Sequence, residues 1–213
     1  HPIMKRNFLS AAMCGICLAV LVLAGCEDDG SSSPDFGEND GDLYVALGDS
    51  ITAGEFIGSS SAYPARLSSL LGKTVINEGR SGETSASGLR RIDGILANRK
   101  PGYILILYGA NDIIRGGSSS TTEHLRNMIV LAKDNNTVPV IATLTPAFHS
   151  HSYMQDSIVA LNEQIRALGS QEHVKVVDLE SAFNWDDSYF LDDGLHPNNS
   201  GAQLIADTFN RAL

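Results

Sequence analysis

Two short segments far apart in the sequence carry side chains that together suit nucleophilic catalysis. Ser50 lies in a Gly-Asp-Ser-Ile run at residues 48–51, and His196 follows Asp193 by three residues near the C-terminus. An aspartate at that spacing can accept the histidine Nδ1–H within one turn, which leaves Nε2 free to take a proton from a serine hydroxyl. A serine at the turn between a strand and a helix also lies beside a helix N-terminus, whose dipole favours developing negative charge.

Two further segments offer hydrogen-bond donors for the oxyanion that acyl transfer creates. Gly82 lies in a polar loop at residues 77–85, and Asn111 lies in a Gly-Ala-Asn-Asp run at residues 109–112. Glycine lets the backbone approach a ligand and present its N–H, and an asparagine amide is worth about 3–4 kcal/mol as an oxyanion donor in comparable sites. Each segment also has a plainer interpretation, namely a capped loop around Gly82 and an Asx-turn at Asn111.

The serine and histidine segments have alternatives too. Ser50 alone could be a helix N-cap, and residues 48–54 could form a phosphate-binding loop, although the carboxylate of Asp49 would repel a phosphate. A lone histidine is often structural, and a metal site is a further alternative for the C-terminal segment. Its ligands would come from Asp192, Asp193, His196, His149 and His151. No closed ligand set appears at regular spacing, and we expect neither a metal nor another cofactor.

The apolar pattern of residues 43–213 predicts an α/β fold with alternating strands and helices. Strands are expected at residues 43–47, 74–77, 103–108, 138–143 and 174–177. Helices are expected at residues 63–71 and 86–97. Three further helices are expected where apolar residues share one helical face: Leu125, Met128, Ile129 and Ala132; Ile158, Leu161, Ile165 and Leu168; Leu204, Ile205, Thr208 and Phe209. Continuous apolar strands are typical of a parallel sheet covered by helices on both faces. Ligands bind such sheets beyond the carboxyl ends of the strands, where the segments above are expected.

Together these segments resemble the SGNH hydrolases, also called GDSL esterases or lipases, over nearly all of residues 43–213. The matching blocks lie at residues 48–51, 81–84, 109–112 and 193–196. Ile51 replaces the usual leucine, which nearly conserves volume, and Ala110 replaces a frequent glycine, which adds a methyl group near the crevice. The likeness is greatest to the bacterial branch of small periplasmic thioesterases, lysophospholipases and arylesterases.

This resemblance implies a three-layer αβα sandwich whose five-stranded parallel sheet has the flavodoxin-like order. It implies that Ser50 is the nucleophile, that His196 is the general base and then acid, and that Asp193 orients His196. The oxyanion would be held by the backbone N–H groups of Ser50 and Gly82 and by the Asn111 side chain. The neighbouring Asp192 is a rival to Asp193 but lies four residues from the histidine rather than three.

The implied activity is that of a serine esterase acting on short to medium acyl esters, thioesters or lysophospholipids. A carbohydrate O-deacetylase would use the same residues, and a non-catalytic binding lipoprotein is the alternative outside the enzymes. Residues 55–61 and 148–153 are expected to line the crevice. In them, Phe56, Ile57 and Phe148 suit either an acyl chain or packing.

The first 42 residues differ in kind from the rest. Lys5 and Arg6 precede an apolar run, which closes with Leu-Ala-Gly-Cys at Cys26. This ending resembles a bacterial lipobox, so we expect residues 1–25 to be a lipoprotein signal peptide and Cys26 to be acylated. A retained transmembrane helix is the alternative, because the run approaches the ~20 residues that span a bilayer. Residues 26–42 carry seven acidic and no basic residues, which predicts a flexible tether before the hydrolase domain at residues 43–213.

The uneven distribution of charge and cysteine narrows the function further. The formal charge is −10 over 213 residues, but residues 43–213 carry only −5 and no cysteine. An acidic chain disfavours nucleic acid as a partner, because phosphate backbones are bound through clustered lysine and arginine. We expect a monomer that acts on a small-molecule or lipid ester. It would be held to a membrane of the bacterial cell envelope, on the periplasmic side or at the cell surface, through lipid on Cys26.

Overall fold

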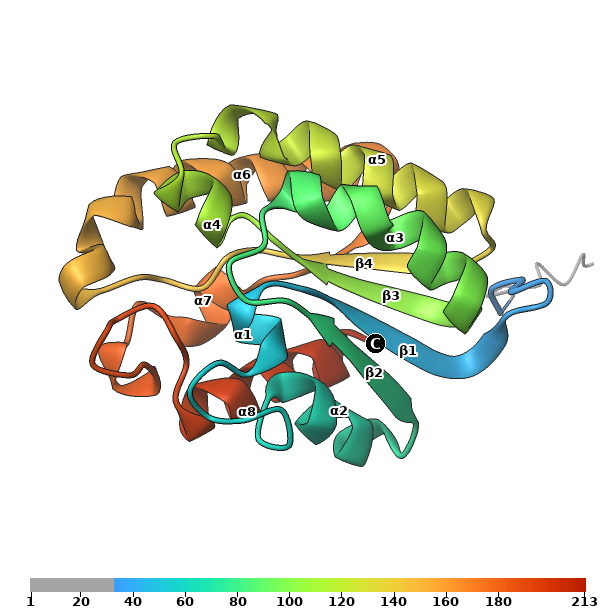
Figure 1. Cartoon of the computed structure of the whole chain (residues 1–213), viewed down its shortest axis with the longest axis horizontal. Coiled ribbons are helices and arrows are strands. Elements are labelled where there is room, and N and C mark those ends of the chain that lie inside the picture. Colours follow the sequence, from blue (N-terminus) through green and yellow to red (C-terminus); the bar gives the residue numbers. More distant parts are fainter. Residues whose placement is uncertain (1–32) are drawn as a thin grey trace, which may run out of the picture. The chain divides into compact units, whose positions relative to one another are not determined.

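The computed structural model describes residues 33–213, so the expected signal peptide and Cys26 lie outside the described residues. Five parallel strands form one sheet in the order β2-β1-β3-β4-β5 (Figure 1). The strands are β1 (Asp40–Gly48), β2 (Thr74–Gly79), β3 (Pro101–Leu107), β4 (Val138–Ala142) and β5 (Lys175–Val177). The α/β fold class and the flavodoxin-like strand order are therefore confirmed.

Helices cover both faces of the sheet and complete the three layers (Figure 1). One face carries α3 (Ser85–Arg99), α4 (Ala110–Ile114), α5 (Thr121–Asp134) and α6 (Gln155–Glu172). The other carries α1 (Ser50–Ala53), α2 (Tyr63–Leu71), α7 (Leu179–Phe183) and α8 (Asn199–Ala212). Short 3-10 helices lie at Ser118–Ser120, His149–Met154 and Asp187–Tyr189. Within residues 33–213, no helix is long and apolar enough to cross a membrane.

The core forms where the continuous apolar strands meet the apolar faces of the helices. Leu47 of β1 lies beside Ile106 of β3, and both are fully buried, as expected for strands covered on both faces. The predicted faces of α5 and α6 are buried throughout. On α8, Leu204 is only half-buried, because the buried face is centred on Ile205 and Phe209.

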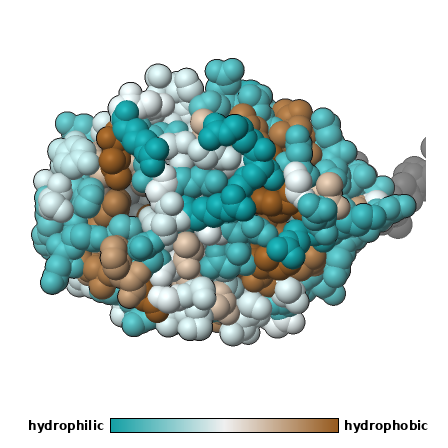
Figure 2. All heavy atoms as spheres, in the orientation of Figure 1, coloured by the Kyte–Doolittle hydropathy of each residue, from teal (hydrophilic) through white to brown (hydrophobic). Residues whose placement is uncertain are grey.

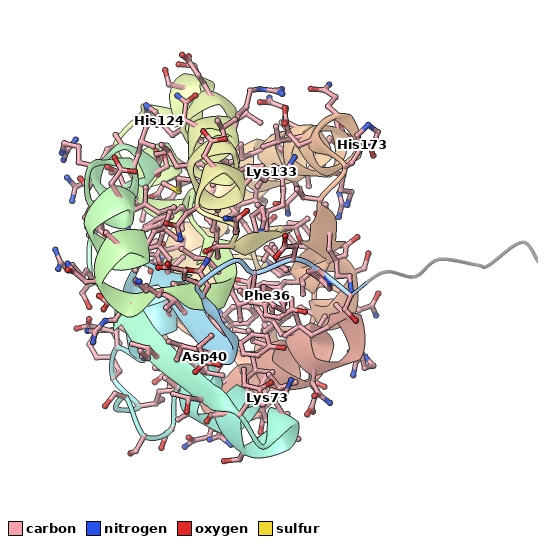
Figure 3. The ribbon with its side chains drawn as sticks, turned by 90° about the vertical axis from the view of Figure 1, so that its right-hand side faces the viewer. Phe36, Asp40, Lys73, His124, Lys133 and His173 are labelled. Carbon is pink, nitrogen blue, oxygen red and sulfur yellow. The ribbon has the colours of Figure 1, made fainter. Side chains whose placement is uncertain are left out.

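The first strand begins earlier than its apolar pattern indicates. It was expected from residue 43, but β1 starts at Asp40, which pairs with Pro101 of β3. Just before β1, the ring of Phe36 lies 5.4 Å from the ring of Tyr103. Figure 3 shows Phe36 and Asp40 on the face where the described chain enters the fold. The last part of the segment expected as a tether thus packs on the domain, because backbone pairing and one aromatic contact outweigh its acidic composition.

All five strands run in the same direction and therefore end at one edge of the sheet. The segments that follow β1, β2 and β3 carry Ser50, Gly82 and Asn111 respectively. The loop that precedes α8 carries His196. Parallel pairing thus gathers at one edge residues that are far apart in the sequence.

Candidate active site

Ser50 is the first residue of α1, directly beyond the end of β1. The residue before it, Asp49, caps the helix, and its Oδ1 atom accepts the backbone N–H of Ile51 at 3.0 Å. The alternative that Ser50 is itself the N-cap is therefore wrong. Because Asp49 performs the capping, the hydroxyl of Ser50 remains available for another partner.

That partner is a histidine from the other end of the chain. The Oγ atom of Ser50 lies 3.0 Å from the Nε2 atom of His196. On the far side of the imidazole, Nδ1 lies 2.6 Å from the Oδ2 atom of Asp193. The three side chains form one hydrogen-bonded line when His196 carries its proton on Nδ1. The structure thus brings together the serine, histidine and aspartate that the sequence analysis singled out.

The turn that carries Asp193 also fixes its carboxyl group. The Oδ1 atom accepts the backbone N–H groups of Leu195 at 2.9 Å and of His196 at 3.0 Å. Partial burial alone would raise the pKa of this carboxyl group, but these N–H bonds and the imidazole outweigh it and hold the pKa below its ordinary value. Gly194 has a φ of 70°, and a Cβ there would lie 2.2 Å from the carbonyl oxygen of Phe148. The turn therefore requires glycine.

The other histidines near this turn have different partners. The Nδ1 atom of His151 lies 2.8 Å from the backbone carbonyl oxygen of Asp193, and the Nε2 atom of His149 lies 4.0 Å from Asp187. Among residues 33–213, no group of three or more His, Cys, Asp or Glu side chains is arranged to hold a metal ion. The geometry therefore gives no support to a metal site at this turn.

The oxyanion-donor candidates lie on the two neighbouring loops. The Nδ2 atom of Asn111 donates to the carbonyl oxygen of Glu83 at 3.1 Å and, over a longer 3.4 Å, to Oδ2 of Asp49. The side chain thus reaches to other loops, whereas an Asx-turn would direct it to its own backbone. Gly82 is exposed at a φ of 74°, and its carbonyl oxygen accepts a bond of 2.7 Å from Arg115.

Asp49 has a larger part in the site than the sequence analysis gave it. Its side chain is 2% exposed and contacts both the helix that carries Ser50 and the amide of Asn111. Burial raises the pKa of its carboxyl group to about 7, although the N–H of Ile51 acts in the opposite direction. The sequence signal for this role is an acidic residue between a buried strand and the candidate nucleophile.

A hydrogen-bonded cluster that the sequence analysis missed is formed around Asp112, the residue that follows Asn111. The carboxyl group of Asp112 accepts the backbone N–H of Ser85 at 2.9 Å and its hydroxyl at 2.5 Å. The Nδ1 atom of His124 lies 2.8 Å from the same hydroxyl oxygen, so His124 donates once the hydroxyl has donated to the carboxylate. The cluster ties the start of α3 to α4. No sequence pattern pairs these residues, because the contact arises only when α3, α4 and α5 pack.

An ion pair holds the loop that carries Gly82. The Nε atom of Arg91 donates to Oε1 of Glu83 at 2.9 Å and its Nη2 atom donates to Oε2 at 2.6 Å, and the hydroxyl of Tyr108 donates to the same carboxyl group at 2.5 Å. Such a two-pronged arginine–carboxylate pair restricts geometry strongly. Because the backbone carbonyl of Glu83 also accepts a hydrogen bond from the Asn111 amide, these contacts fix Gly82 and Asn111 relative to α3 and to Tyr108, which directly follows β3.

The three apolar residues expected in the crevice have different surroundings. The ring of Phe148 lies 5.3 Å from Phe190 and 6.2 Å from Trp185, which is packing. Ile57 lines a void of about 10 Å³ beside Ser50, which is far too small for an acyl chain. Phe56 is 71% exposed.

Hydrophobic surface on the face seen in Figure 2 forms separate patches between hydrophilic residues.

Comparisons with known proteins agree with the observed fold. The model of the GDSL-like Lipase/Acylhydrolase family matches residues 46–204. Thioesterase 1/protease 1/lysophospholipase L1 of Escherichia coli (strain K12) is 31% identical over 178 residues, which cover 81% of this chain and 83% of that protein. An arylesterase of Vibrio mimicus is 31% identical over 170 residues, covering 76% and 84%. An acetylxylan esterase structure from Geobacillus stearothermophilus has a TM-score of 0.71 at 20% identity, covering 82% and 94%.

Proposed function

The chain belongs to the GDSL-like lipase/acylhydrolase family, and on this premise we propose that it is a serine esterase whose nucleophile is Ser50. His196 is the general base and then the general acid, and Asp193 orients it. The observation that carries the proposal is the continuous line from the Ser50 hydroxyl through His196 to Asp193, with separations of 3.0 Å and 2.6 Å. Both lie within the range of a direct hydrogen bond.

In the first half of the reaction, Ser50 attacks the ester carbonyl. Its hydroxyl proton passes to Nε2 of His196 while Oγ forms a bond to the carbonyl carbon. The carboxylate of Asp193 balances the positive charge on the imidazolium. The same proton then passes to the leaving alcohol as its bond to the acyl carbon breaks, and an acyl group remains on Ser50. Water, deprotonated by His196, attacks this acyl-enzyme and releases the acid, so no step requires a metal or cofactor.

The negative charge on the carbonyl oxygen is stabilised by the backbone N–H groups of Ser50 and Gly82 and by the Asn111 amide. The 3.1 Å bond to Glu83 keeps this amide in place. The 3.4 Å contact with Asp49 is long, so the second amide hydrogen can be given to the oxyanion with little loss. This exchange supports Asn111 as the side-chain donor.

The proposal is tested with p-nitrophenyl acetate as the substrate. We expect Ser50→Ala to abolish turnover and Ser69→Ala, which removes an exposed hydroxyl on α2, to retain it. A Ser50→Ala sample that is pure and folded and keeps more than a tenth of the wild-type rate would overturn the proposal.

The acyl group is expected to be short to medium in length. The Escherichia coli relative is named as a thioesterase and lysophospholipase and the Vibrio mimicus relative as an arylesterase. The second candidate is a carbohydrate O-deacetylase, since an acetylxylan esterase has this fold and acetyl transfer needs the same groups. A panel of p-nitrophenyl esters of increasing chain length, a thioester, a lysophospholipid and acetylated xylan separates these substrates by kcat/KM.

We further propose that the enzyme is a monomeric lipoprotein of the bacterial cell envelope, anchored through lipid on Cys26. The support is the lipobox-like ending of the apolar run. Expressed with residues 1–26 present, the wild type should incorporate labelled palmitate, whereas Cys26→Ser should not. Equal palmitate labelling of both proteins would overturn the anchor.

A further inference from the structure

Phe56 combines an exposed aromatic side chain with an unfavourable backbone. The side chain is 71% exposed, and the residue has a φ of 66°. Bulky residues rarely adopt positive φ, because the side chain then crowds the backbone. Neither burial nor backbone preference explains a phenylalanine here, and such strain is often retained where it serves a function.

The surrounding loop holds Phe56 in this conformation. The carbonyl oxygen of Gly54 accepts the backbone N–H groups of Ile57 at 3.2 Å and Gly58 at 2.8 Å. On the residue before Phe56, the carboxyl group of Glu55 accepts a hydrogen bond from the hydroxyl of Ser81. The loop is therefore fixed on both sides of Phe56, and the ring is presented on a defined backbone.

The ring faces the candidate general acid. Its centre lies 4.9 Å from that of the His196 imidazole at an interplanar angle of 81°, which is an edge-to-face contact. A hollow of about 390 Å³ begins at this contact, and its lining residues are Phe56, Leu191, Asp192 and Asp193. We call it the Phe56 hollow. None of these residues belongs to the loops that carry Gly82 and Asn111.

The position of the hollow decides which part of an ester it meets. In the proposed reaction, the carbonyl oxygen turns to Gly82 and Asn111, while the leaving oxygen must approach Nε2 of His196 to receive its proton. The hollow is lined by two residues that contact the His196 imidazole, Phe56 and Asp193, and it is separate from the oxyanion donors, so it lies beside the leaving alcohol. The acyl chain, which is bonded to the opposite side of the carbonyl carbon, extends elsewhere.

We propose that the Phe56 hollow is the binding subsite for the leaving alcohol and that it selects an uncharged, apolar alcohol. This inference rests on the proposed function. Phe56 and Leu191 supply the apolar contact. Asp192 is exposed at the rim and Asp193 also lines the hollow, so the subsite is acidic and repels an anionic leaving group.

The test uses acetate esters with leaving alcohols of similar intrinsic reactivity, namely benzyl acetate and methyl acetate. Phe56→Gly removes the ring while glycine keeps the positive φ without strain, so the variant should fold at least as stably as the wild type. We expect the ratio of kcat/KM for benzyl acetate to that for methyl acetate to fall about tenfold. The ratio for benzyl hexanoate to benzyl acetate should stay the same.

Two controls complete the design. Leu70→Ala truncates an exposed apolar side chain on α2 (43% exposed) and should leave both ratios unchanged, and Phe56→Tyr should keep the benzyl preference. A benzyl-to-methyl ratio in Phe56→Gly within twofold of the wild type would overturn the inference. A shift confined to the hexanoate-to-acetate ratio would do the same, since it would assign the ring to the acyl chain.

The acidic rim is tested separately with 4-(acetoxymethyl)benzoate, which adds a carboxylate to the leaving alcohol. Relative to benzyl acetate, Asp192→Asn should raise its kcat/KM severalfold, and raising the ionic strength should weaken the difference. An unchanged ratio in Asp192→Asn would overturn charge selection at the rim. A wild type that hydrolyses none of these esters would instead contradict the proposed function, so the two failures are distinguishable.

Discussion

The Nδ1 atom of His196 lies 2.6 Å from the Oδ2 atom of Asp193, while the other oxygen of the same carboxyl group accepts the backbone N–H groups of Leu195 and His196. One carboxyl group thus holds both the imidazole and the turn that carries it. The hydrogen bonds that lower the pKa of Asp193 keep it ionised at neutral pH, which is the state that stabilises an imidazolium.

Replacing Asp193 by asparagine should therefore impair catalysis far more than folding. An amide can donate to Nδ1 and so favour the tautomer that places the histidine proton on Nε2, facing Ser50. We expect kcat to fall by about 10³–10⁴-fold, measured with p-nitrophenyl acetate. Asp192→Asn leaves the 2.6 Å contact between His196 and Asp193 intact, so its kcat with the same substrate should fall less than about tenfold. Equal losses in the two variants would contradict the assignment of Asp193.

Removing the Asn111 amide should lower kcat with little effect on KM. The amide is proposed to contact the oxyanion mainly in the transition state, so Asn111→Ala should cost about 10²–10³-fold in kcat. Steady-state kinetics with a short ester measure this split. Asn98→Ala, on the exposed part of α3, is the matched control. An Asn111→Ala variant that raises KM and spares kcat would show that the amide binds the ground state instead.

Ser85→Ala should destabilise the protein and disturb the position of Asn111. The substitution removes the 2.5 Å bond to Asp112 and the partner of His124, which leaves a buried carboxylate with one partner fewer. We expect a loss of about 1–3 kcal/mol in the free energy of unfolding, measured by urea denaturation. Ser87→Ala removes a half-buried hydroxyl whose bond from Arg90 is exposed to solvent, and it should cost less. A Ser85→Ala variant as stable as the wild type would show that the cluster does not stabilise the fold.

Asp49 should make stability depend on pH in a definite direction. Burial raises the pKa of its carboxyl group in the folded state from 3.8 to about 7, so the unfolded chain loses this proton at lower pH than the folded protein does. The contribution of the protonated Asp49 to the free energy of unfolding is fully present below about pH 4. It declines as the pH rises towards 7, by at most about 1.4 kcal/mol for each pH unit.

Asp49→Asn cannot titrate at this position and should lose that part of the pH dependence. Urea denaturation at pH 4.5 and pH 7.5 measures the difference for the wild type, for Asp49→Asn and for the exposed control Asp134→Asn. We expect the free energy of unfolding of the wild type and of Asp134→Asn to decline equally between these two pH values, and we expect Asp49→Asn to lack this decline. An identical decline in all three proteins would contradict the raised pKa of Asp49.

Much of this arrangement could be predicted from the sequence because local patterns express it. The buried strands are continuous apolar runs, and parallel pairing makes their carboxyl ends coincide. Ser50, Gly82 and Asn111 therefore had to lie at one edge once their runs were recognised as following strands. The link between Asp193 and His196 was visible because both residues lie in one turn.

The remainder depends on contacts that no local pattern encodes. Ser85 and His124 belong to different helices and meet only when these pack. The start of β1 at Asp40 was missed because backbone pairing with β3 and an aromatic contact at Phe36 outweigh the acidic composition of this segment. The positive φ of Phe56 was also invisible, since a bulky residue is among the least expected there.

The central claim is that Ser50 is the nucleophile, and covalent labelling tests it most directly. Folded wild-type protein is treated with a fluorophosphonate, digested, and analysed by mass spectrometry. Because an activated serine displaces fluoride and retains the phosphonyl group, we expect a stoichiometric adduct on the peptide containing Ser50. Prior denaturation or His196→Ala should abolish it. Undiminished ester hydrolysis without an adduct on Ser50, or with the adduct on another serine, would contradict the account.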